Sequence, residues 1–486
     1  MQEGLNMTTQ TIFSHRFLAR ITIEAETPLA IGSGERNVLT DRLVATDVNG
    51  LPYIPGTALT GLLRHALQTN SAHFVNQLFG FQSGDQGEGS RLVISSAQMV
   101  GKDGIVVDGL QIIDFEDHFY NHYRHLPVRQ HVHINHDGSA EKGGKFDEQV
   151  VFKGTRFCFE LELIGSEQDS ELWNQLLNLF AQPTFRIGGG TRKGFGAIKI
   201  VECLTETIQL TKNLDRYLSK SSHLADPQKW WKKESVHLLN TCSANGWFTY
   251  RVELHAENFF LFGSGFGNED ADMTYVTEQI VKWNEQTGLP QFEEAYTLIP
   301  ASSVKGALAH RTAFHFNKNH GIFADNLMDS GKLDLLIKLN YIQTSSPKEF
   351  SSKHFSERAK LIMDGNPAVR AIFGYAANDT DGQRGNAIFS DVFLKNVPEK
   401  KKLLNHVAID RFTGGAMEGA LFSEEVSANN IRFELNVLVQ NGINEEYLRA
   451  FEAALNDLCN GSLALGGGTM RGHGCFNGSF EKHITN

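Results

Sequence analysis

The sequence has few cysteines, few prolines and no long hydrophobic run. Its 486 residues include five cysteines, which lie far apart and form no C-x-x-C pair, so neither a zinc ribbon nor a disulfide framework is expected. No run approaches the roughly 20 apolar residues of a membrane span, and the N-terminus lacks the charged-then-apolar pattern of a signal peptide. We therefore expect a cytoplasmic protein with buried free thiols.

Basic charge is also in short supply. The formal net charge is −11, which disfavours a protein that coats nucleic acid unaided, although a local field can still bind it. Hydrophobic residues make up 41% of the chain, as in globular proteins, and the length favours two domains. The 46 glycines far outnumber the 11 prolines, which favours many tight turns.

Five blocks of sequence occur twice, in the same order. The clearest pairs are "YIPGTALTGLLRHAL" with "LIPASSVKGALAHRT", and "RIGGGTRKGFG" with "ALGGGTMRGHG". Chance similarity does not preserve such an order. We infer a tandem duplication, with a first domain at 1–217, a linker at 218–245 and a second domain at 246–486. The Ser, Lys and Pro content of "SKSSHLADPQKWWKKES" is typical of an exposed connector.

The order of patterns within each copy predicts an α+β fold. Each copy runs strand, helix, strands, a long polar loop, strand, helix, glycine stretch, strand. This order favours a βαββαβ unit, which is a ferredoxin-like (RRM-like) sheet with its helices on one face. The other face is expected to be free, and in RNA-binding domains of this topology that face meets the RNA.

The helix after "IPG" or "IPAS" is a candidate phosphate site. Thr57 in the first copy, and Ser302 or Ser303 in the second, occupy expected N-cap positions. A helix N-terminus offers free N–H groups and partial positive charge, which suit a phosphate. The polar side of the helix also carries Thr60 and Arg64 in the first copy and Lys305 in the second. The alternative is a capped amphipathic helix with no ligand.

The glycine stretches match no known nucleotide loop. Neither is G-x-x-x-x-G-K-[ST], and neither is a G-x-G-x-x-G between a strand and a helix. One interpretation is a tight bend where helix and sheet approach closely. The other is a bare backbone that accommodates a polyphosphate chain without reading bases, because Arg192, Lys193 and Arg471 flank the glycines.

Together these features resemble the repeat-associated mysterious protein (RAMP) superfamily. Each half resembles the backbone subunit of type III CRISPR effector complexes, and the polar loop containing "HVAIDRFTGGA" resembles their thumb hairpin. The resemblance covers almost the whole chain twice, as expected of the fused form in type III-D complexes. It implies binding of CRISPR guide RNA, cleavage of the paired target RNA, and association with other RAMP-type and large subunits.

The resemblance also implies a catalytic aspartate in the loop before the "IPG" helix. Asp41 lies nine residues after Gly32, and Asp272 lies nine residues after Gly263, with Asp270 as a competitor in the second copy. The next acidic residues, Asp47 and Glu278, are again matched in spacing. An aspartate is ionised at neutral pH and accepts protons poorly. It is therefore expected to hold Mg²⁺ or Mn²⁺, largely through RNA phosphates and water, or to position the 2′-hydroxyl.

A histidine-rich region spans residues 118–136. A metal site and an acid–base pair are open interpretations, beside that of polar hairpin or sheet residues. His131 matches His406 of the second copy, whereas His133 has no counterpart. Arg129 and Arg411 are better candidates for phosphate contacts, because guanidinium groups stay charged.

Three functions remain open from the sequence. The first is an RNA-guided, metal-dependent endoribonuclease with one site in each domain, favoured by the two matched aspartates. The second is a guide-binding scaffold that does not cut. The third is a nuclease that processes precursor CRISPR RNA, which requires an acid–base pair such as His with Tyr or Lys. The expected RNA-binding residues are Thr57, Thr60, Arg64, Arg129, His131, Gly188, Gly189, Gly190, Arg192, Lys193, Ser302, Ser303, Lys305, Arg411, Gly466, Gly467, Gly468 and Arg471.

Overall fold

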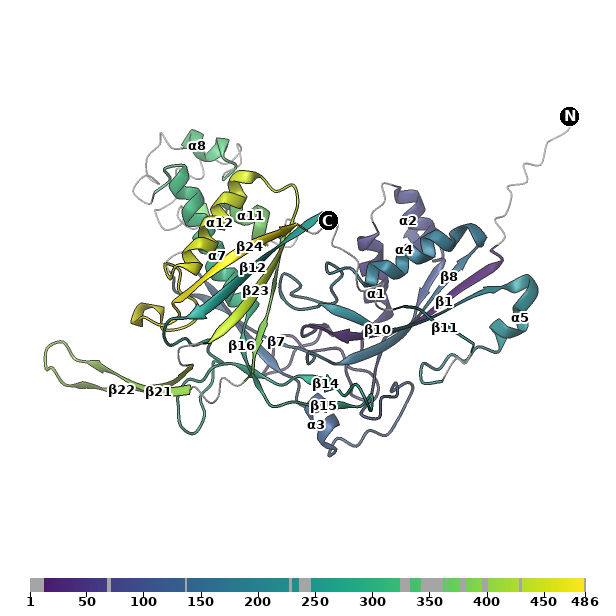
Figure 1. The fold of residues 1–486 in the computed structure, drawn as a ribbon, viewed down its shortest axis with the longest axis horizontal. Coiled ribbons are helices and arrows are strands. Elements are labelled where there is room, and N and C mark those ends of the chain that lie inside the picture. The colour runs from purple at the N-terminus through teal and green to yellow at the C-terminus, as the bar shows by residue number, and fades with distance from the viewer. Residues whose placement is uncertain are drawn as a thin grey trace.

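The computed structural model describes residues 13–67, 71–135, 138–226, 230–235, 246–323, 333–341, 362–363, 365–375, 382–395, 401–427 and 431–484. Across these residues the protein is a mixed α+β structure, built mainly of antiparallel sheets and arranged in two halves (Figure 1). Among the described residues, no helix combines the length and the hydrophobicity that a bilayer crossing requires.

The first half contains one main sheet with strand order β11-β10-β1-β8-β4, and β5 also pairs with β8. All of these neighbours are antiparallel. Its elements are β1 (His15–Ala25), α1 (Gly56–Ala66), α2 (Ala72–Phe79), β2 (Phe81–Ser83), β3 (Gln86–Glu88), β4 (Leu92–Ile94), β5 (Gln98–Met99), α3 (His118–Arg124), β6 (Val128–Ile134), β7 (Ala140–Gln149), β8 (Arg156–Gly165), η1 (Glu167–Asp169), α4 (Ser170–Phe180), β9 (Lys193–Gly194), β10 (Ile198–Gln209), α5 (Leu210–Leu218) and β11 (Lys232–Lys233).

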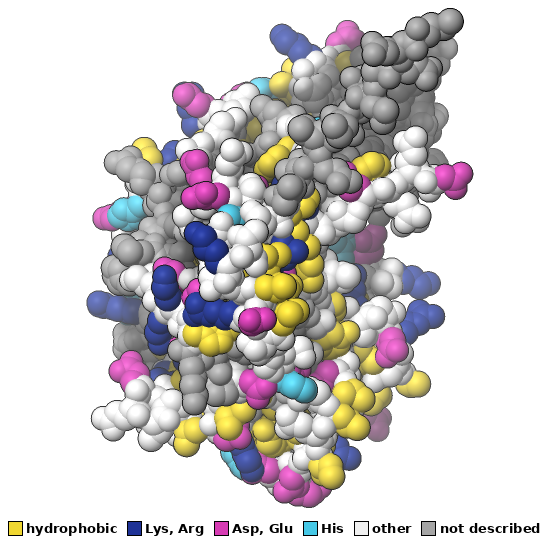
Figure 2. Space-filling model, turned by 90° about the vertical axis from the view of Figure 1, so that its right-hand side faces the viewer, with side chains coloured by type: hydrophobic (Ala, Val, Ile, Leu, Met, Phe, Trp, Pro, Cys, Tyr) yellow, Lys and Arg dark blue, Asp and Glu magenta, His cyan; other side chains and the backbone are white. Residues whose placement is uncertain are grey.

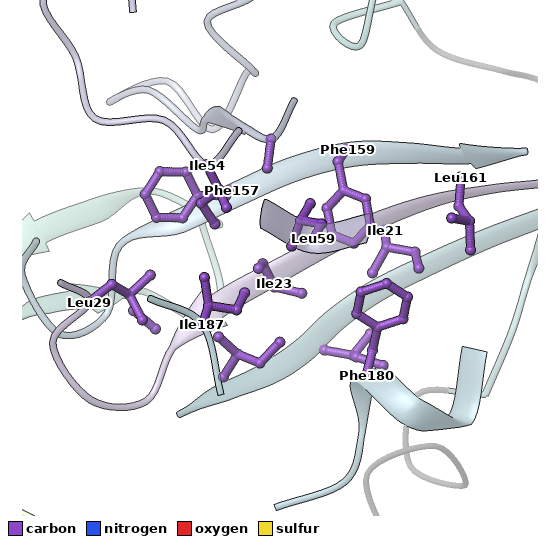
Figure 3. Packing of buried hydrophobic residues seen from close by; sticks show 14 of the residues in the cluster. Ile21, Ile23, Leu29, Ile54, Leu59, Phe157, Phe159, Leu161, Phe180 and Ile187 are labelled. Atoms are coloured by element: carbon purple, nitrogen blue, oxygen red, sulfur yellow. The ribbon is translucent and has the colours of Figure 1, made fainter. Parts of the chain in front are cut away.

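The core of the first half lies between this sheet and the helices α1 and α4. Alternate residues of β1 and β8 point into it, because side chains alternate between the two faces of a strand. Figure 3 shows Ile21, Ile23 and Phe159 of the sheet meeting Leu59 of α1 and Phe180 of α4, all fully buried. The period-2 strands and the apolar stripe of the helix therefore pack as the sequence predicts.

The second half contains a main sheet with strand order β24-β12-β23-β19-β9. Its helices α7 and α12 pack on each other and on the sheet (Figure 1). Its elements are β12 (Trp247–Ala256), β13 (Thr277–Glu278), β14 (Val281–Trp283), β15 (Pro290–Phe292), β16 (Tyr296–Ile299), α7 (Ala301–Asn319), α8 (Leu333–Lys338), α11 (Pro367–Phe373), β17 (Gly374–Tyr375), β18 (Gln383–Arg384), β19 (Ala387–Ser390), β20 (Val392–Leu394), β21 (Lys401–Ile409), β22 (Ala416–Ser427), β23 (Arg432–Gln440), α12 (Glu445–Cys459), η5 (Thr469–Arg471) and β24 (Phe476–Ile484).

The two sheets share one strand order. The series β10-β1-β8-β4 in the first half corresponds to β24-β12-β23-β19 in the second. This order is consistent with the βαββαβ unit predicted for each copy. The long polar loops form two-stranded hairpins, β6–β7 and β21–β22, and both hairpins change register at the same place, between Val132 and Ile134 and between Val407 and Ile409.

The halves are joined through their sheets and through side chains. Strand β9, from the first glycine stretch, adds parallel to β19 at the edge of the second sheet. Arg129 of β6 pairs with Glu278 (Nε–Oε2 2.6 Å) and Asp391 (Nη2–Oδ2 3.2 Å) of the second half. The β14–β15 hairpin returns to pack on the first half, where Trp283 donates to the Gly154 carbonyl at 2.8 Å. The first hairpin therefore lies between the halves, whereas β21–β22 projects at the far end (Figure 1).

The linker covers the outer face of the first sheet, which was expected to be free. Trp231 is buried against Leu18 and Ile208, and Arg20 donates to the main-chain oxygens of linker residues His223 and Asp226. Strand β11 of the linker pairs with β10. Most described linker residues are exposed, as expected of a connector, whereas Trp231 is buried because it shields the apolar Leu18 and Ile208 on this face. On the face shown in Figure 2, described basic, acidic and hydrophobic side chains are interspersed.

Both helices after the "IP" motifs begin two or three residues earlier than predicted. Helix α1 starts at Gly56 and α7 at Ala301, each preceded by an extended proline that makes no side-chain cap. The caps come instead from matching residues elsewhere in the chain. Ser96 Oγ accepts from the Gly56 N–H at 3.3 Å, and Asp391 Oδ1 accepts from the Ala301 N–H at 2.7 Å. Thr57, Ser302 and Ser303 therefore lie within the first turn and are not N-caps.

Candidate functional site

The loop that follows the first strand has the same geometry in both halves. Gly32 bridges Val44 in the first loop, and Gly263 bridges Tyr275 in the second. Within each loop an asparagine closes a turn: Asn37 accepts from the backbone N–H groups two and three residues later, and Asn268 does the same. Because this turn register is shared, Asp41 and Asp272 occupy matching positions.

Each of these aspartates is held against the second strand of its hairpin. Asp41 Oδ2 accepts the Asp147 N–H of β7 at 2.9 Å. Asp272 Oδ2 accepts both the N–H and the hydroxyl of Ser423 of β22, at 2.8 and 3.0 Å. The hydrogen bonds from Ser423 lower the pKa of Asp272. Both aspartates are exposed and keep a carboxylate oxygen available for a ligand.

The matched register separates Asp272 from its competitor Asp270. Asp270 corresponds to Leu39 of the first loop, since both donate an N–H to the turn asparagine two residues earlier. The matched spacing of Asp47 and Glu278 does not extend to their environments. Asp47 accepts from the Leu51 N–H in a local turn, whereas Glu278 is buried against Arg129. Asp41 and Asp272 are therefore the pair that both loops place alike.

Beside Asp41, a buried glutamate gathers three segments of the chain. Glu148 of β7 accepts from His131 of β6 at 2.7 Å and pairs with Lys193 of the glycine stretch. Arg42, the residue after Asp41, approaches the same carboxylate at 3.8 Å. The His131 ring stacks on Phe146 with the centroids 4.9 Å apart. The hairpin, the glycine stretch and the aspartate loop therefore meet at Glu148.

The second half repeats this cluster around Glu424 of β22. His406 of β21 lies 2.8 Å from the Glu424 carboxylate and stacks on Phe422 at 4.8 Å. Arg471 of the second glycine stretch pairs with Glu424 at 2.6 Å. His473 occupies the position of Phe195 and lies 3.6 Å from the same carboxylate. The matched histidine, the phenylalanine and two residues of the glycine stretch thus surround a glutamate in each half. Sequence reasoning did not single out either glutamate.

The charged partners keep Glu148 ionised despite its burial. Burial raises the pKa of a carboxyl, but the hydrogen bond from His131 and the charge and hydrogen bond of Lys193 lower it further, to about 2. The same burial lowers the pKa of Lys193, and Glu148 opposes that shift. Glu148 therefore acts as a permanent negative charge inside a basic cluster.

The glycine stretches bend tightly against the turn after the first strand. Gly188 has φ +85° and Gly466 has φ +89°, and a Cβ at either position would collide with a carbonyl oxygen of that turn. Gly189 donates to the Ala30 carbonyl at 2.8 Å, and Gly467 donates to the Leu261 carbonyl at 2.7 Å. The tight-bend interpretation therefore describes the local structure, and the N–H groups of Gly189 and Gly467 are already occupied. Phosphate contact at Gly188–Gly190 and Gly466–Gly468 stays a prediction.

A second basic group lies where the first glycine stretch meets the second half. Arg192 donates to the Gly385 carbonyl at 2.8 Å, and Arg384 donates to Thr191 at 2.9 Å. Burial, with repulsion from Arg384 and Arg186, lowers the pKa of Arg192 to about 9. Burial, with repulsion from Arg192 and Lys193, lowers the pKa of Lys305 to about 8.

Negative charge is missing from this group. Among the described residues neither Arg192 nor Lys305 forms an ion pair, and Arg192 Nη1 is buried without a hydrogen-bond partner in that part of the chain. Partly buried cations that lack a carboxylate are stabilised by an anion. This group, formed by Arg192, Lys305 and Arg384 and called the basic seam below, is therefore suited to a phosphate.

Other predicted RNA-binding residues have structural partners. Arg129 is buried by its two carboxylates, and these raise its pKa although burial opposes them. Arg64 joins α1 to α2 through the Gly80 carbonyl and Asn76, at 2.9 and 2.7 Å. The Thr60 hydroxyl donates to the Gly56 carbonyl within its own helix. Arg411 lies exposed at the tip of the second hairpin and is open to a ligand.

Among its described residues, the histidine-rich region forms no metal site. His122 stacks on Phe292 of the second half with the centroids 3.9 Å apart, and His133 pairs with Glu141 at 2.6 Å, while His136 lies outside the described residues. Among the residues that the structure describes, no group of three or more His, Cys, Asp or Glu side chains is arranged to hold a metal ion. Asp41 and Asp272 each supply one carboxylate, which alone is too few protein ligands for Mg²⁺ or Mn²⁺.

A comparison with protein-family models matches the RAMP superfamily over residues 22–199 and 293–477. The chain belongs to the RAMP superfamily. The superfamily consists in general of CRISPR-associated RNA-binding proteins, and two matched regions in one chain are consistent with a tandem double RAMP protein. No curated protein matches the chain. The two matched regions contain both glycine stretches and both hairpins.

Glu148 and Glu424 were missed by sequence reasoning although a signal was present. The repeated blocks contain "KFDEQVVF" and "LFSEEVS", in which a phenylalanine precedes a glutamate by two residues. In a strand this spacing places both side chains on one face, beside the histidine of the paired strand. The repeated spacing, read with the matched histidines, predicts the cluster.

Proposed function

We propose that the chain is the fused double backbone subunit of a type III CRISPR effector complex, of the III-D form, with a ferredoxin-like domain in each half. In this proposal each half binds a segment of guide RNA and cleaves the paired target RNA once. The observation that carries it is the placement of Asp41 and Asp272. Both lie at the same point of the same loop and against the same strand of a hairpin, next to the glutamate that pairs with the basic residue of a glycine stretch.

The basic seam supports RNA binding by an acidic protein. The chain carries a net charge of −11, yet Arg192, Lys305 and Arg384 lie together with too little negative charge. Lys193 and Arg471 pair with Glu148 and Glu424, and each glutamate follows the residue that donates a hydrogen bond to the candidate aspartate. A phosphate backbone that runs from one glycine stretch to the other would neutralise these cations in turn. Contacts of this kind do not read sequence, as expected where base pairing with a guide selects the target.

The proposed reaction is attack of an RNA 2′-hydroxyl on the adjacent phosphate. Asp41 and Asp272 would position the hydroxyl or share a divalent ion, Mg²⁺ or Mn²⁺, with RNA phosphates and water, since one carboxylate per site cannot hold the ion alone. Such an ion would neutralise charge on the phosphate. A deoxyribose has no 2′-hydroxyl, so a target with DNA at the cleaved position is expected to resist both sites.

The test is to purify the protein with its native partners and sequence the RNA that accompanies it. Short RNAs with a constant repeat-derived end are expected, and a complementary target should then be cut at two positions. Absence of RNA at low salt would contradict the proposal. A complex that holds guide RNA but makes no cut would favour the non-cleaving scaffold.

One observation also favours the processing nuclease as a second candidate. That activity needs a histidine beside an acid such as lysine, and Lys193 Nζ lies 3.4 Å from His131 Nε2. The same purified protein should therefore be offered a precursor RNA containing two repeats. Cleavage within the repeat, without any guide-directed cut, would select this alternative.

A further inference from the structure

A glutamate–histidine pair lies beside each candidate aspartate and has no role in the function proposed so far. His131 Nε2 lies 2.7 Å from Glu148 Oε1, and His406 Nε2 lies 2.8 Å from Glu424 Oε1. Both glutamates are almost fully buried, and each histidine lies opposite a phenylalanine on the paired strand. The pair recurs in both halves with the same ring nitrogen facing the carboxylate.

The carboxylate determines which ring nitrogen carries the hydrogen. Because Glu148 stays ionised, it can only accept, so Nε2 of His131 must be the donor. A neutral imidazole with hydrogen on Nε2 has its lone pair on Nδ1, which can then take a proton. The buried carboxylate also stabilises the imidazolium that forms afterwards. The same contact at Glu424 gives His406 the same arrangement.

The pair and the aspartate converge on one stretch of strand. Asp41 is hydrogen-bonded to the N–H of Asp147, which lies between Phe146 and Glu148 in β7. Asp272 is hydrogen-bonded to Ser423, which lies between Phe422 and Glu424 in β22. Asp41 and His131 therefore contact neighbouring residues of β7, and Asp272 and His406 contact neighbouring residues of β22.

Attack by a 2′-hydroxyl needs a proton acceptor, and an ionised aspartate is a weak one. We propose that His131 and His406 accept the proton of the attacking 2′-hydroxyl, and that Glu148 and Glu424 are the positioning residues that hold each imidazole in the accepting form. This inference rests on the proposed function and supplies the proton acceptor that the proposed function does not name.

The step is balanced in atoms and charge. Nδ1 takes the 2′-hydroxyl proton while the 2′-oxygen bonds to the adjacent phosphorus, and the bond from phosphorus to the next 5′-oxygen breaks. That oxygen leaves with a proton from water, and the imidazolium returns its proton to solvent. The products are a 2′,3′-cyclic phosphate and a 5′-hydroxyl.

The charges around each ring differ between the halves. His131 faces Glu148, Lys193 and Arg42, with Asp391 and Arg129 beyond them. His406 faces Glu424, Arg471 and His473. The two cuts are therefore expected to follow different pH–rate profiles.

The test uses the two cuts of the whole complex as internal references for each other. H131Q is expected to slow the first-half cut about 100-fold and leave the second unchanged, and H406Q should do the reverse. H133Q is the matched control, because His133 lies on the same strand with 61% of its side chain exposed. It should leave both cuts within about twofold of wild type.

The positioning role has its own readout. E148Q should lower kcat for the first cut and move its pH–rate profile without changing KM for the target, and E148D should restore part of the rate. If H131Q and H406Q cut normally while D41N and D272N lose one cut each, the inference fails and the proposed function stands. If H131Q loses guide RNA and both cuts, the histidine is structural and the inference is overturned. If wild type makes no cut, the proposed function fails first.

Discussion

The two clusters share their acidic and imidazole groups but differ in the cations around them. Both contain an aspartate, a histidine, a glutamate and a phenylalanine at matching positions. The first surrounds them with Arg42, Lys193 and Phe195. The second has Met273, Arg471 and His473 at the same places. The shared groups are those that the proposed chemistry uses. The residues that differ between the two clusters therefore need a separate explanation.

That explanation lies in the surroundings of each cluster. The first lies at the junction of the halves, where β9 joins the second sheet and Arg129 meets two buried carboxylates. The second lies at the far end, where Met470 is fully exposed and Leu404 replaces Arg129. Residues that differ between the copies therefore reflect which surface covers each site. Residues that agree include those that the proposed reaction uses.

The largest expected effect comes from making the first hairpin resemble the second. R129L leaves Glu278 and Asp391 buried without their cation, which should destabilise the chain by about 3–5 kcal/mol. Chemical denaturation measures this change. R411L at the exposed hairpin tip is the control and should stay within about 0.5 kcal/mol of wild type. An equal effect of both variants would contradict the account of the junction.

The next effect concerns RNA at the seam. R192M introduces the residue that the second glycine stretch carries, and K305A removes a neighbouring cation. Together they should weaken guide-RNA binding about tenfold and reduce the slope of affinity against salt by about 0.7 for each phosphate that is no longer neutralised. R449M on the exposed face of α12 is the matched control. Unchanged affinity in the seam variant would show that RNA does not cross there.

A smaller effect is expected in the pH dependence of stability. The pKa of Glu148 is lowered from 4.5 to about 2, so its ionised form stabilises the folded state above pH 4.5. This contribution, on the order of 3 kcal/mol, should be lost as the pH falls toward 2. The difference in unfolding free energy between wild type and E148Q should therefore be largest near neutral pH and shrink in acid. A constant difference would contradict the assignment.

The smallest expected effect distinguishes the two aspartates of the second loop. D270N should leave both cuts within about twofold of wild type, because Asp270 corresponds to a leucine in the first loop. The cleavage assay measures both cuts in one reaction. If D270N loses the second cut while D272N keeps it, Asp270 rather than Asp272 is the aspartate of the second cleavage site.

The sequence predicted what depends on order and spacing. The duplication and the matched loop positions of Asp41 and Asp272 follow from repeated blocks, and the hairpins follow from the family resemblance. The apolar stripe that buries Leu59 and Leu63 of α1 follows from helical spacing. Local patterns determine these features, because periodicity sets which side of an element is buried.

Contacts between distant segments could not be predicted in the same way. The caps of α1 and α7 come from Ser96 and Asp391, which lie 40 and 90 residues away. Arg129 was expected to meet phosphate and instead meets Glu278 of the other half. A charged side chain looks alike in sequence whether it faces a ligand or a buried partner. The packing of Trp231 on the first sheet could not be predicted either, because the sequence does not show which surface buries a linker tryptophan.

The central claim is that each half carries one cleavage site at its loop aspartate. The most direct test is the target cleavage pattern of D41N, D272N and the double variant in the purified complex. Each single variant should lose one of the two cuts by about 100-fold and keep the other, and the double variant should cut nowhere while still holding guide RNA. Persistence of both cuts in the double variant would contradict the account.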